Sequence, residues 1–416
     1  MLYQFFRLYL VCALALFSTN TFSAADHSHH STAPTIDSEV DPGCGNGLVE
    51  PNCAIVATPT FDSKGKLWVI WTTKDHVYVS QSSDDGISFD VTLLITEAEF
   101  GVANSQEARP LIEIAPNGDI YVLFRLQQEA KRSGFVYFSR STDGGLSFSK
   151  PMLISDEENP TYKAFHAMTL EDNGVITIAW LDKRDSIKAK QSETAYNGSA
   201  IYFSQSYDRG ESFGENKKVM DYTCQCCRTM LENKPTQGSA LVWRNIFGDN
   251  IRDHGIASIE NGEVVGDVAR ISDDNWYVEA CPHHGPSLSI NSQGQYHTTW
   301  FSGGGNRKGV FYANSTDNGV TFSTPMQVGN KDLASHAYVL SGDNNTVIAW
   351  KEFNGELSQI KAMISPDNGK SWSVPMTVST SGSESGHPLL IKDGTWISLA
   401  WRSGDEGFRL FKITNL

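Results

Sequence analysis

The sequence predicts an all-β protein, a single β-propeller of seven four-stranded blades, with six blades as the alternative. Two internal repeats lead to this prediction. An octet of the form Ser-x-Asp-x-Gly-x-x-aromatic occurs five times, each time after a short apolar segment. A second apolar segment that ends in an aromatic residue occurs seven times. Its spacing of about 50–63 residues is the length of a four-stranded blade with its loops.

The octets are predicted to be tight turns between the third and fourth strands of their blades. Asp and Gly tolerate left-handed backbone, and the Asp carboxylate accepts N–H groups of the turn. The terminal aromatic is expected to fold back between neighbouring sheets. The octets span 82–89, 141–148, 206–213, 315–322 and 365–372. The seven apolar segments span 67–71, 120–124, 175–180, 240–243, 296–300, 347–350 and 396–401.

The octet resembles the Asp-box of bacterial sialidases and their many relatives without that activity. The resemblance covers nearly the whole mature chain and implies the propeller fold. In sialidases three arginines bind the substrate carboxylate, and an Asp acid and a Tyr–Glu pair carry the reaction. This chain lacks the family's Phe/Tyr-Arg-Ile-Pro motif, and the nearest text is Ala108-Arg109-Pro110. The Cys-x-Cys-Cys and Cys-Pro-His-His loops look like those of an exported subfamily labelled sialidase-like for its repeats alone.

The N-terminal segment predicts export. Residues 1–25 combine a basic residue, an apolar run and small residues before the expected cleavage site, the pattern of a secretory signal peptide. Residues 26–43 are polar, contain three histidines and are predicted to form a flexible tail. The propeller is assigned to 44–416, in the periplasm or outside the cell. Its last blade ends after a third strand, so a segment near 44–53 is expected to supply the fourth and close the ring.

Composition limits the partners. The net charge of −15 argues against nucleic acid and anionic membranes. No segment after the signal peptide is long and apolar enough to cross a membrane. We expect a monomer that binds a metal ion, a small anionic or glycan ligand, or another exported protein.

Residues just before the innermost strands occupy equivalent positions in successive blades, so a propeller brings them to the mouth of its central channel. Histidine or arginine occupies this position in most blades, although each histidine could instead cap its own strand. The residues concerned are Arg109, His166, Arg228, His284, His336 and His387.

Four cysteines are predicted to lie at the same mouth, in the loops that enter the fourth and fifth blades. They are Cys224, Cys226, Cys227 and Cys281, and His283 and His284 follow the last. Thiolate and imidazole ligands suit copper or zinc, and copper is favoured here. Disulfides are the alternative, with Cys44 pairing with Cys53 and a bridge reaching Cys281.

Two main functions therefore remain open. The first is a metal site that serves binding, delivery or redox chemistry, with ligands from His166, Cys224, Cys226, Cys227, Cys281, His283, His284, His336 and His387. The second is a sialidase-like glycosidase or acidic-glycan-binding module that uses Arg109, Arg228, Arg252 and Asp253. Tyr277 and Glu279 are too close in sequence to resemble the separated Tyr–Glu pair of sialidases. No catalytic residue is assigned.

Overall fold

The computed structural model of the protein describes residues 49–416 apart from 131–132 and 157–160. The predicted signal peptide and tail lie outside the described residues. The described chain forms seven antiparallel sheets, six with four strands and one with three. In every sheet the strands follow one another in sequence order, as in a propeller blade.

The first three blades contain strands β1 to β12. Blade 1 is β1 (Val56–Phe61), β2 (Leu67–Thr72), β3 (His76–Ser82) and β4 (Val91–Glu97). Blade 2 is β5 (Leu111–Ile114), β6 (Ile120–Gln127), β7 (Gly134–Ser141) and β8 (Met152–Leu153). Blade 3 is β9 (Lys163–Leu170), β10 (Ile176–Asp182), β11 (Ser199–Ser206) and β12 (Lys217–Thr223).

The other four blades contain β13 to β27. Blade 4 is β13 (Met230–Asn233), β14 (Ser239–Arg244), β15 (His254–Glu260) and β16 (Glu263–Arg270). Blade 5 is β17 (Ser287–Ile290), β18 (Tyr296–Gly304), β19 (Arg307–Ser315) and β20 (Met326–Val328). Blade 6 is β21 (Ala334–Ser341), β22 (Thr346–Phe353), β23 (Ser358–Ser365) and β24 (Met376–Ser381). Blade 7 is β25 (Leu389–Lys392), β26 (Trp396–Ser403) and β27 (Gly407–Asn415).

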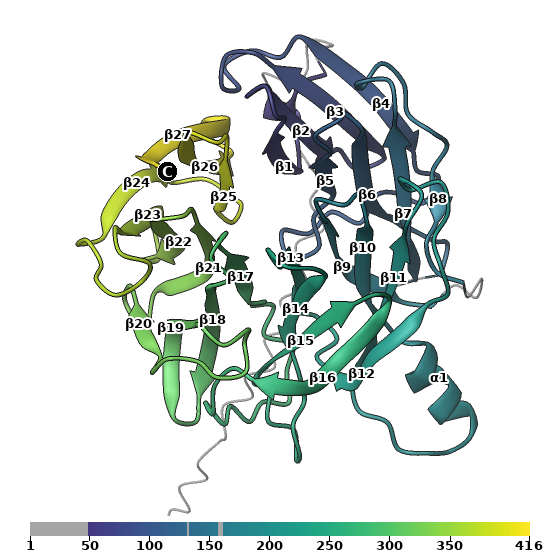
Figure 1. The fold of residues 1–416 in the computed structure, drawn as a ribbon, viewed down its shortest axis with the longest axis vertical. Coiled ribbons are helices and arrows are strands. Elements are labelled where there is room, and N and C mark those ends of the chain that lie inside the picture. The colour runs from purple at the N-terminus through teal and green to yellow at the C-terminus, as the bar shows by residue number, and fades with distance from the viewer. Residues whose placement is uncertain (1–48, 131–132, 157–160) are drawn as a thin grey trace, which may run out of the picture. The chain divides into compact units, whose positions relative to one another are not determined.

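The seven innermost strands form a closed ring. Strands β1, β5, β9, β13, β17, β21 and β25 each contact the next, and β25 contacts β1 (Figure 1). The structure therefore confirms the seven-bladed propeller and not the six-bladed alternative.

Blade 7 shows how the first and last blades meet. The described part of the segment that was expected to supply a fourth strand contains a 3-10 helix, η1 (Pro51–Cys53). It packs beside β27, and Asn52 Oδ1 accepts the Phe408 N–H at 3.2 Å. Cys53 is disulfide-bonded. Its predicted partner Cys44 lies outside the described residues.

The five octets connect the third and fourth strands of blades 1, 2, 3, 5 and 6. In the octet of blade 3, Ser206 Oγ accepts the Gly210 N–H at 2.8 Å and donates to Asp208. The Asp208 carboxylate accepts the Ser212 N–H at 2.9 Å. The terminal Phe213 meets Phe138 of the preceding blade edge-on, with ring centroids 4.9 Å apart. Each octet aromatic can thus anchor one blade to another.

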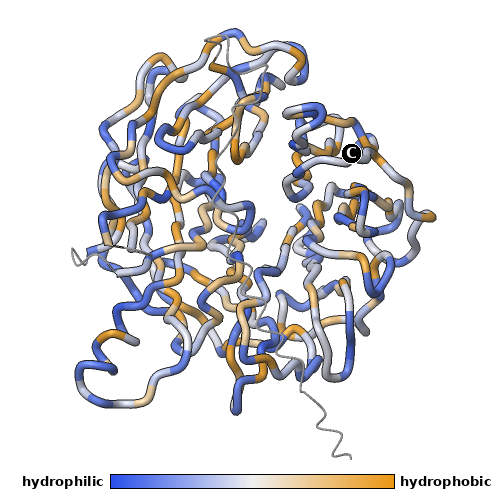
Figure 2. Tube along the Cα trace, turned by 180° about the vertical axis from the view of Figure 1, so that it is seen from behind, coloured by the Kyte–Doolittle hydropathy of each residue, from blue (hydrophilic) through white to orange (hydrophobic). Residues whose placement is uncertain are grey.

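The seven apolar segments are the second strands, and their terminal aromatics are buried between blades. The indole N–H groups find nearby acceptors, for example Asp182 for Trp180 and Asn245 for Trp243. Figure 2 shows hydrophobic residues recurring along the strands, with hydrophilic residues in many of the loops. The core is therefore a set of layers between adjacent sheets.

One α-helix, α1 (Arg184–Gln191), lies between β10 and β11. No helix of this size was expected from the sequence. It starts where Asp182 Oδ1 accepts the Arg184 N–H at 2.8 Å, which satisfies one of the amides that a helix start leaves open. Among the described residues, no helix has the length and apolar character that a membrane span requires.

Candidate functional site

The loops that enter the blades and the loops after the second strands meet on one face of the propeller. Arg244, at the end of β14, donates to the main-chain oxygen of His284 in the loop before β17, at 2.8 Å. Two clusters of chemically reactive side chains lie in these loops. One consists of imidazoles around Glu107, and the other consists of thiols.

Three of the four equivalent histidines come together as a stack. The ring centroids of His284 and His336 are 4.2 Å apart, and those of His336 and His387 are 3.6 Å apart. Phe301 extends the stack at the other side of His284, at 4.2 Å. Burial lowers the pKa of His284 to about 2 and that of His387 to about 4. At neutral pH these imidazoles are therefore uncharged.

Glu107 is the acidic centre of this cluster, and the sequence argument did not identify it. Its carboxylate accepts the Gly285 N–H at 2.8 Å and the Arg228 Nη1–H at 3.2 Å. His387 Nδ1 lies 3.3 Å from Glu107 Oε1. Burial, the largest single influence, raises the pKa of Glu107, but Arg228 together with the neighbouring His387 and His336 outweighs it and holds the pKa well below its usual range. Glu107 is therefore ionised and links loops of blades 2, 4, 5 and 7.

Arg228 is saturated by acceptors of the protein itself. Besides Glu107 it donates to the Tyr338 hydroxyl at 2.6 Å and to the main-chain oxygens of Gly285 and Pro286 at 3.0 and 3.1 Å. Its guanidinium lies 4.1 Å from the centre of the Tyr338 ring. A buried Arg with this many partners is a structural element of the mouth, and no donor is left to clamp a substrate carboxylate.

Arg109 is also turned toward the protein. Its guanidinium donates to the main-chain oxygens of Gln106 and Ala57 and to the Gln106 side chain. It is 6% exposed. Arg252, the third member of the arginine set, donates to Cys224 Sγ at 3.5 Å. The three arginines therefore have different partners and do not reproduce a sialidase triad.

Two other predicted ligands lie apart from the imidazole stack. His166 is buried beside Arg109 and Arg125, and burial lowers its pKa to about 3. His283 is exposed at a left-handed backbone position with φ of 52°. Among the described residues, neither belongs to a group of three close metal-ligating atoms.

The thiols form the second cluster. Cys224 Sγ lies 3.7 Å from Cys226 Sγ and 3.1 Å from Cys227 Sγ, and all three are buried free thiols. Cys281 is a free, exposed thiol that interacts with Cys226. The loops entering blades 4 and 5 thus bring the four cysteines together, as the sequence suggested.

The pKa values of the four thiols are shifted in different directions by their surroundings. Hydrogen bonds from Cys226 and Cys227 lower the pKa of Cys224 well below its usual value, and Arg244 adds to this effect. A hydrogen bond from Cys226 lowers the pKa of Cys281 to about 7. Burial raises the pKa of Cys227. Cys224 and Cys281 are therefore the thiols that ionise first.

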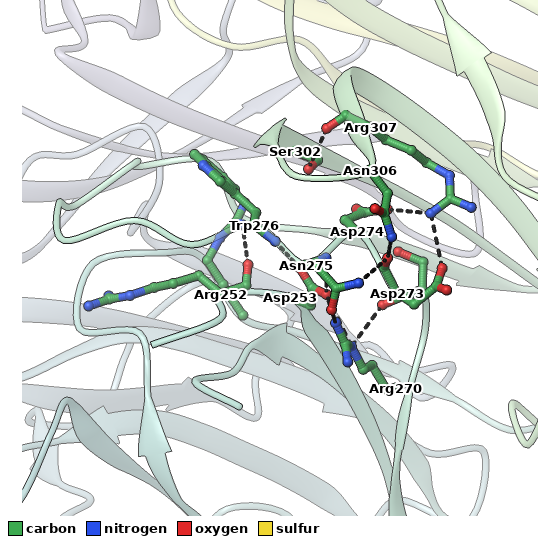
Figure 3. Close-up of polar contacts among 12 residues, drawn as sticks. Arg252, Asp253, Arg270, Asp273, Asp274, Asn275, Trp276, Ser302, Asn306 and Arg307 are labelled. Atoms are coloured by element: carbon green, nitrogen blue, oxygen red, sulfur yellow. Dashed lines mark hydrogen bonds and ion pairs between the residues drawn. The ribbon is translucent and has the colours of Figure 1, made fainter. Parts of the chain in front are cut away.

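A polar network anchors the loop that carries Cys281 and His284 (Figure 3). The Asp253 carboxylate accepts Arg270 Nε–H at 3.0 Å and the Asn275 N–H at 2.9 Å. In Figure 3 the Arg252 side chain extends away from this network. Asp253, predicted to bind a ligand, is 1% exposed and instead fixes the loop.

Tyr277 and Glu279 are hydrogen-bonded in the same loop. The Tyr277 hydroxyl donates to Glu279 at 2.5 Å, and Tyr277 is 56% exposed. The bond to Glu279 raises the pKa of Tyr277. A raised pKa makes the phenolate harder to form, so the pair is not an activated nucleophile as it stands.

Comparison with known proteins defines the fold but no family. No protein-family model and no curated protein matches the sequence. An ulvan lyase structure with bound -[GlcA(1-4)Rha3S]- is similar with a TM-score of 0.55 at 12% identity, over 85% of this chain and 93% of the lyase. A Hadza microbial sialidase has a TM-score of 0.52 at 11% identity, over 87% and 75%.

A protein of unknown function from Dyadobacter fermentans has a TM-score of 0.50 at 14% identity, over 74% of this chain and 94% of that one. These likenesses show that the chain shares its propeller fold with an ulvan lyase and a sialidase. At such low identity they show the fold alone.

Proposed function

We propose that this propeller is exported and binds a thiolate-preferring metal ion, with copper(I) favoured over zinc, through Cys224, Cys226 and Cys227. One observation carries the proposal. Three buried free thiols from one short loop have Sγ atoms that all lie within 4.8 Å of one another. Soft thiolate ligands select copper(I) and zinc.

The geometry suits such an ion. Sulfur ligands at about 2.3 Å from a tetrahedral ion lie about 3.8 Å apart. Cys224 and Cys226 are 3.7 Å apart, while Cys224 and Cys227 are closer, at 3.1 Å. A small outward shift of Cys227 would complete three sulfur ligands, and Cys281 beside Cys226 is the candidate for the fourth.

Nearby cations favour the ionised thiols that a metal needs. Arg252 donates to Cys224 Sγ, and the charge of Arg244 also acts on this thiol. Since metal ligands must be deprotonated, these guanidiniums lower the cost of forming the site. The exposed Cys281 gives an incoming ion a first contact at the surface of the mouth.

The test is a copper(I) titration of the reduced protein without oxygen, in competition with a chromophoric copper(I) chelator. We expect one tightly bound copper(I) per chain and its loss in Cys224→Ser/Cys227→Ser. Cys281→Ser, the matched control outside the buried three, is expected to keep the ion with weaker affinity. Equal copper(I) content in wild type and the double variant would refute the proposal.

A thiol count on the untreated protein tests the competing disulfide interpretation. Alkylation followed by mass spectrometry is expected to find four reactive cysteines after chelation and unfolding. A Cys224–Cys227 or Cys226–Cys281 disulfide in the protein as purified from its own compartment would show that the cluster is structural, and the proposal would fail.

Glycan binding is the second candidate. It is supported by the fold shared with an ulvan lyase and a sialidase, and by the exposed Tyr277–Glu279 pair beside the mouth. The arginine contacts weigh against it, because Arg109 and Arg228 already donate to protein groups. A fluorogenic sialoside and ulvan oligosaccharides test it, with Tyr277→Phe as the variant. Absence of both turnover and binding would remove it.

A further inference from the structure

We propose that Glu107, His336 and His387 form a second metal site, separate from the thiols, for a divalent ion that prefers imidazole, such as Cu(II) or Zn(II). The three residues come from blades 2, 6 and 7. Their ligand atoms all lie within 4.8 Å of one another. The site does not require the thiol cluster to bind metal, so the two proposals fail independently.

The spacing of the ligand atoms fits coordination. Nitrogen and oxygen ligands at about 2.0–2.1 Å from a tetrahedral ion lie about 3.3 Å apart. His387 Nδ1 and Glu107 Oε1 are 3.3 Å apart and interact directly when no ion is bound. An ion bound by both atoms would replace this contact at nearly the same separation.

The imidazoles around the site have unused nitrogens. The Nδ1 atoms of His284 and His336 are buried and have no hydrogen-bond partner among the described residues, and that of His387 has Glu107 as its neighbour. Buried polar atoms without a partner are unfavourable in a folded protein. A bound ion would satisfy the nitrogen that His336 offers, whereas His284 stacks on His336 and does not belong to the three residues whose ligand atoms lie together.

The backbone conformation of His336 orients its imidazole toward His387. His336 has a φ of +50° and lies within a register shift of β21 between Ser335 and Tyr338. Left-handed backbone is unfavourable for a residue with a side chain, and bulges redirect side chains beside functional sites. The result here is an imidazole turned onto His387 at 3.6 Å between ring centroids.

The carboxylate of Glu107 is oriented by hydrogen bonds from neighbouring residues, as expected for a metal ligand. The main-chain N–H groups of Gly285 and Arg228 donate hydrogen bonds to Glu107 Oε2, at 2.8 and 3.3 Å. Hydrogen bonds of this kind orient ligating carboxylates. Arg228 Nη1 also lies 3.2 Å from Oε1 and offsets the negative charge of Glu107. Ions bound by charge alone, such as Ca²⁺ and Mg²⁺, are therefore disfavoured relative to ions that prefer imidazole.

The two clusters differ in the ions they suit. The imidazole–carboxylate set matches Cu(II) or Zn(II), whereas the thiols match Cu(I). They are nevertheless linked by the chain, since Cys227 precedes Arg228 and Cys281 is three residues from His284. Three residues span at most about 11 Å, so the clusters are near neighbours with separate ligands.

The experiment uses the full chain with all four thiols replaced, Cys224→Ser/Cys226→Ser/Cys227→Ser/Cys281→Ser, so that added Cu(II) cannot oxidise them. Cu(II) is titrated and followed by electron paramagnetic resonance. We expect a bound Cu(II) with nitrogen hyperfine coupling. Adding His336→Ala/His387→Ala is expected to reduce the number of bound ions by one, or the affinity at least 100-fold. His76→Ala, a histidine of β3 that belongs to neither ligand cluster, is the matched control.

A second measurement guards against misfolding of the variants. Circular dichroism and the Tm without metal are expected to show that the His336→Ala/His387→Ala protein is folded. Zn(II) is expected to raise the Tm of the parent protein and of the His76→Ala control but not that of the double variant. The same Cu(II) stoichiometry and affinity with and without the two histidines would overturn the proposal, and the remaining copper would then be assigned to other histidines.

Discussion

Glu113 is predicted to make the propeller less stable as the pH rises. It lies on β5 and interacts with Glu232 on β13. Burial and the Glu232 charge raise the pKa of Glu113 from 4.5 to about 8. A carboxyl whose pKa is raised on folding stabilises the protein fully below pH 4.5, and this stability is lost as the pH rises through 8.

The size of the effect follows from that shift. Between pH 5 and pH 8, linkage gives a loss of about 3.5 kcal/mol from this one carboxyl. Because Glu113 is half-buried rather than fully enclosed, we expect about 2–3 kcal/mol. Glu113→Gln keeps the shape of the side chain and removes its ionisation. The variant should match wild type at pH 5 and be about 2–3 kcal/mol more stable at pH 8.

Denaturant unfolding at pH 5, 6.5 and 8 measures the free energies of unfolding directly. Glu356→Gln, in an exposed loop, is the matched control and should leave the pH dependence unchanged. A stability difference between Glu113→Gln and wild type that is the same at all three pH values would refute the reasoning. The conclusion would then be that water in the channel solvates the carboxylate.

Two further predictions concern the repeats and the loop at the mouth. Gly210→Ala should destabilise the propeller by about 2 kcal/mol or more, because a Cβ would lie 2.6 Å from Phe138 at a φ of +75°. Thermal unfolding checks this against Gly118→Ala, which has a φ of +91° but no atom within 4 Å. Asp253→Ala should loosen the loop that carries Cys281, seen as faster amide hydrogen exchange there, since Arg270 and two backbone amides lose their acceptor. Unchanged exchange in that loop would count against its role as the anchor.

The repeats predicted the fold because each one reflects a local structural requirement, which returns in five blades for the octet and in all seven for the second strand. The octet needs Gly where its backbone is left-handed and touches the preceding blade, as Gly210 touches Phe138. The second strand needs a large aromatic such as Trp180 to fill the layer between sheets. The α-helix was missed because it belongs to one loop only, where Asp182 caps an insertion that no repeat marks.

The site was only partly predictable. Equivalent positions in the repeat predict which face of the propeller a residue lies on, but they do not predict which side chains it contacts. The positions of His284, His336 and His387 in the repeat were enough to predict that they converge. Nothing in the repeat pattern marked Glu107, which lies outside the matching positions and reaches the mouth from its own loop. Its one available signal was an acidic residue two positions before Arg109.

The contacts of Glu107 also bear on the two functions that the sequence left open, because they determine which guanidiniums are paired within the protein. A mouth that recognised a substrate carboxylate would keep its guanidiniums unpaired and facing solvent. Here Arg228 is paired with Glu107, and Arg109 donates to Gln106. Removing Glu107 would leave the buried Arg228 charge without its partner at a cost of about 3–5 kcal/mol. A ligand carboxylate would have to replace these contacts before gaining any new ones. The described part of the mouth also carries neutral imidazoles with unpartnered nitrogens and free thiols, and both groups are ligand types for metal ions.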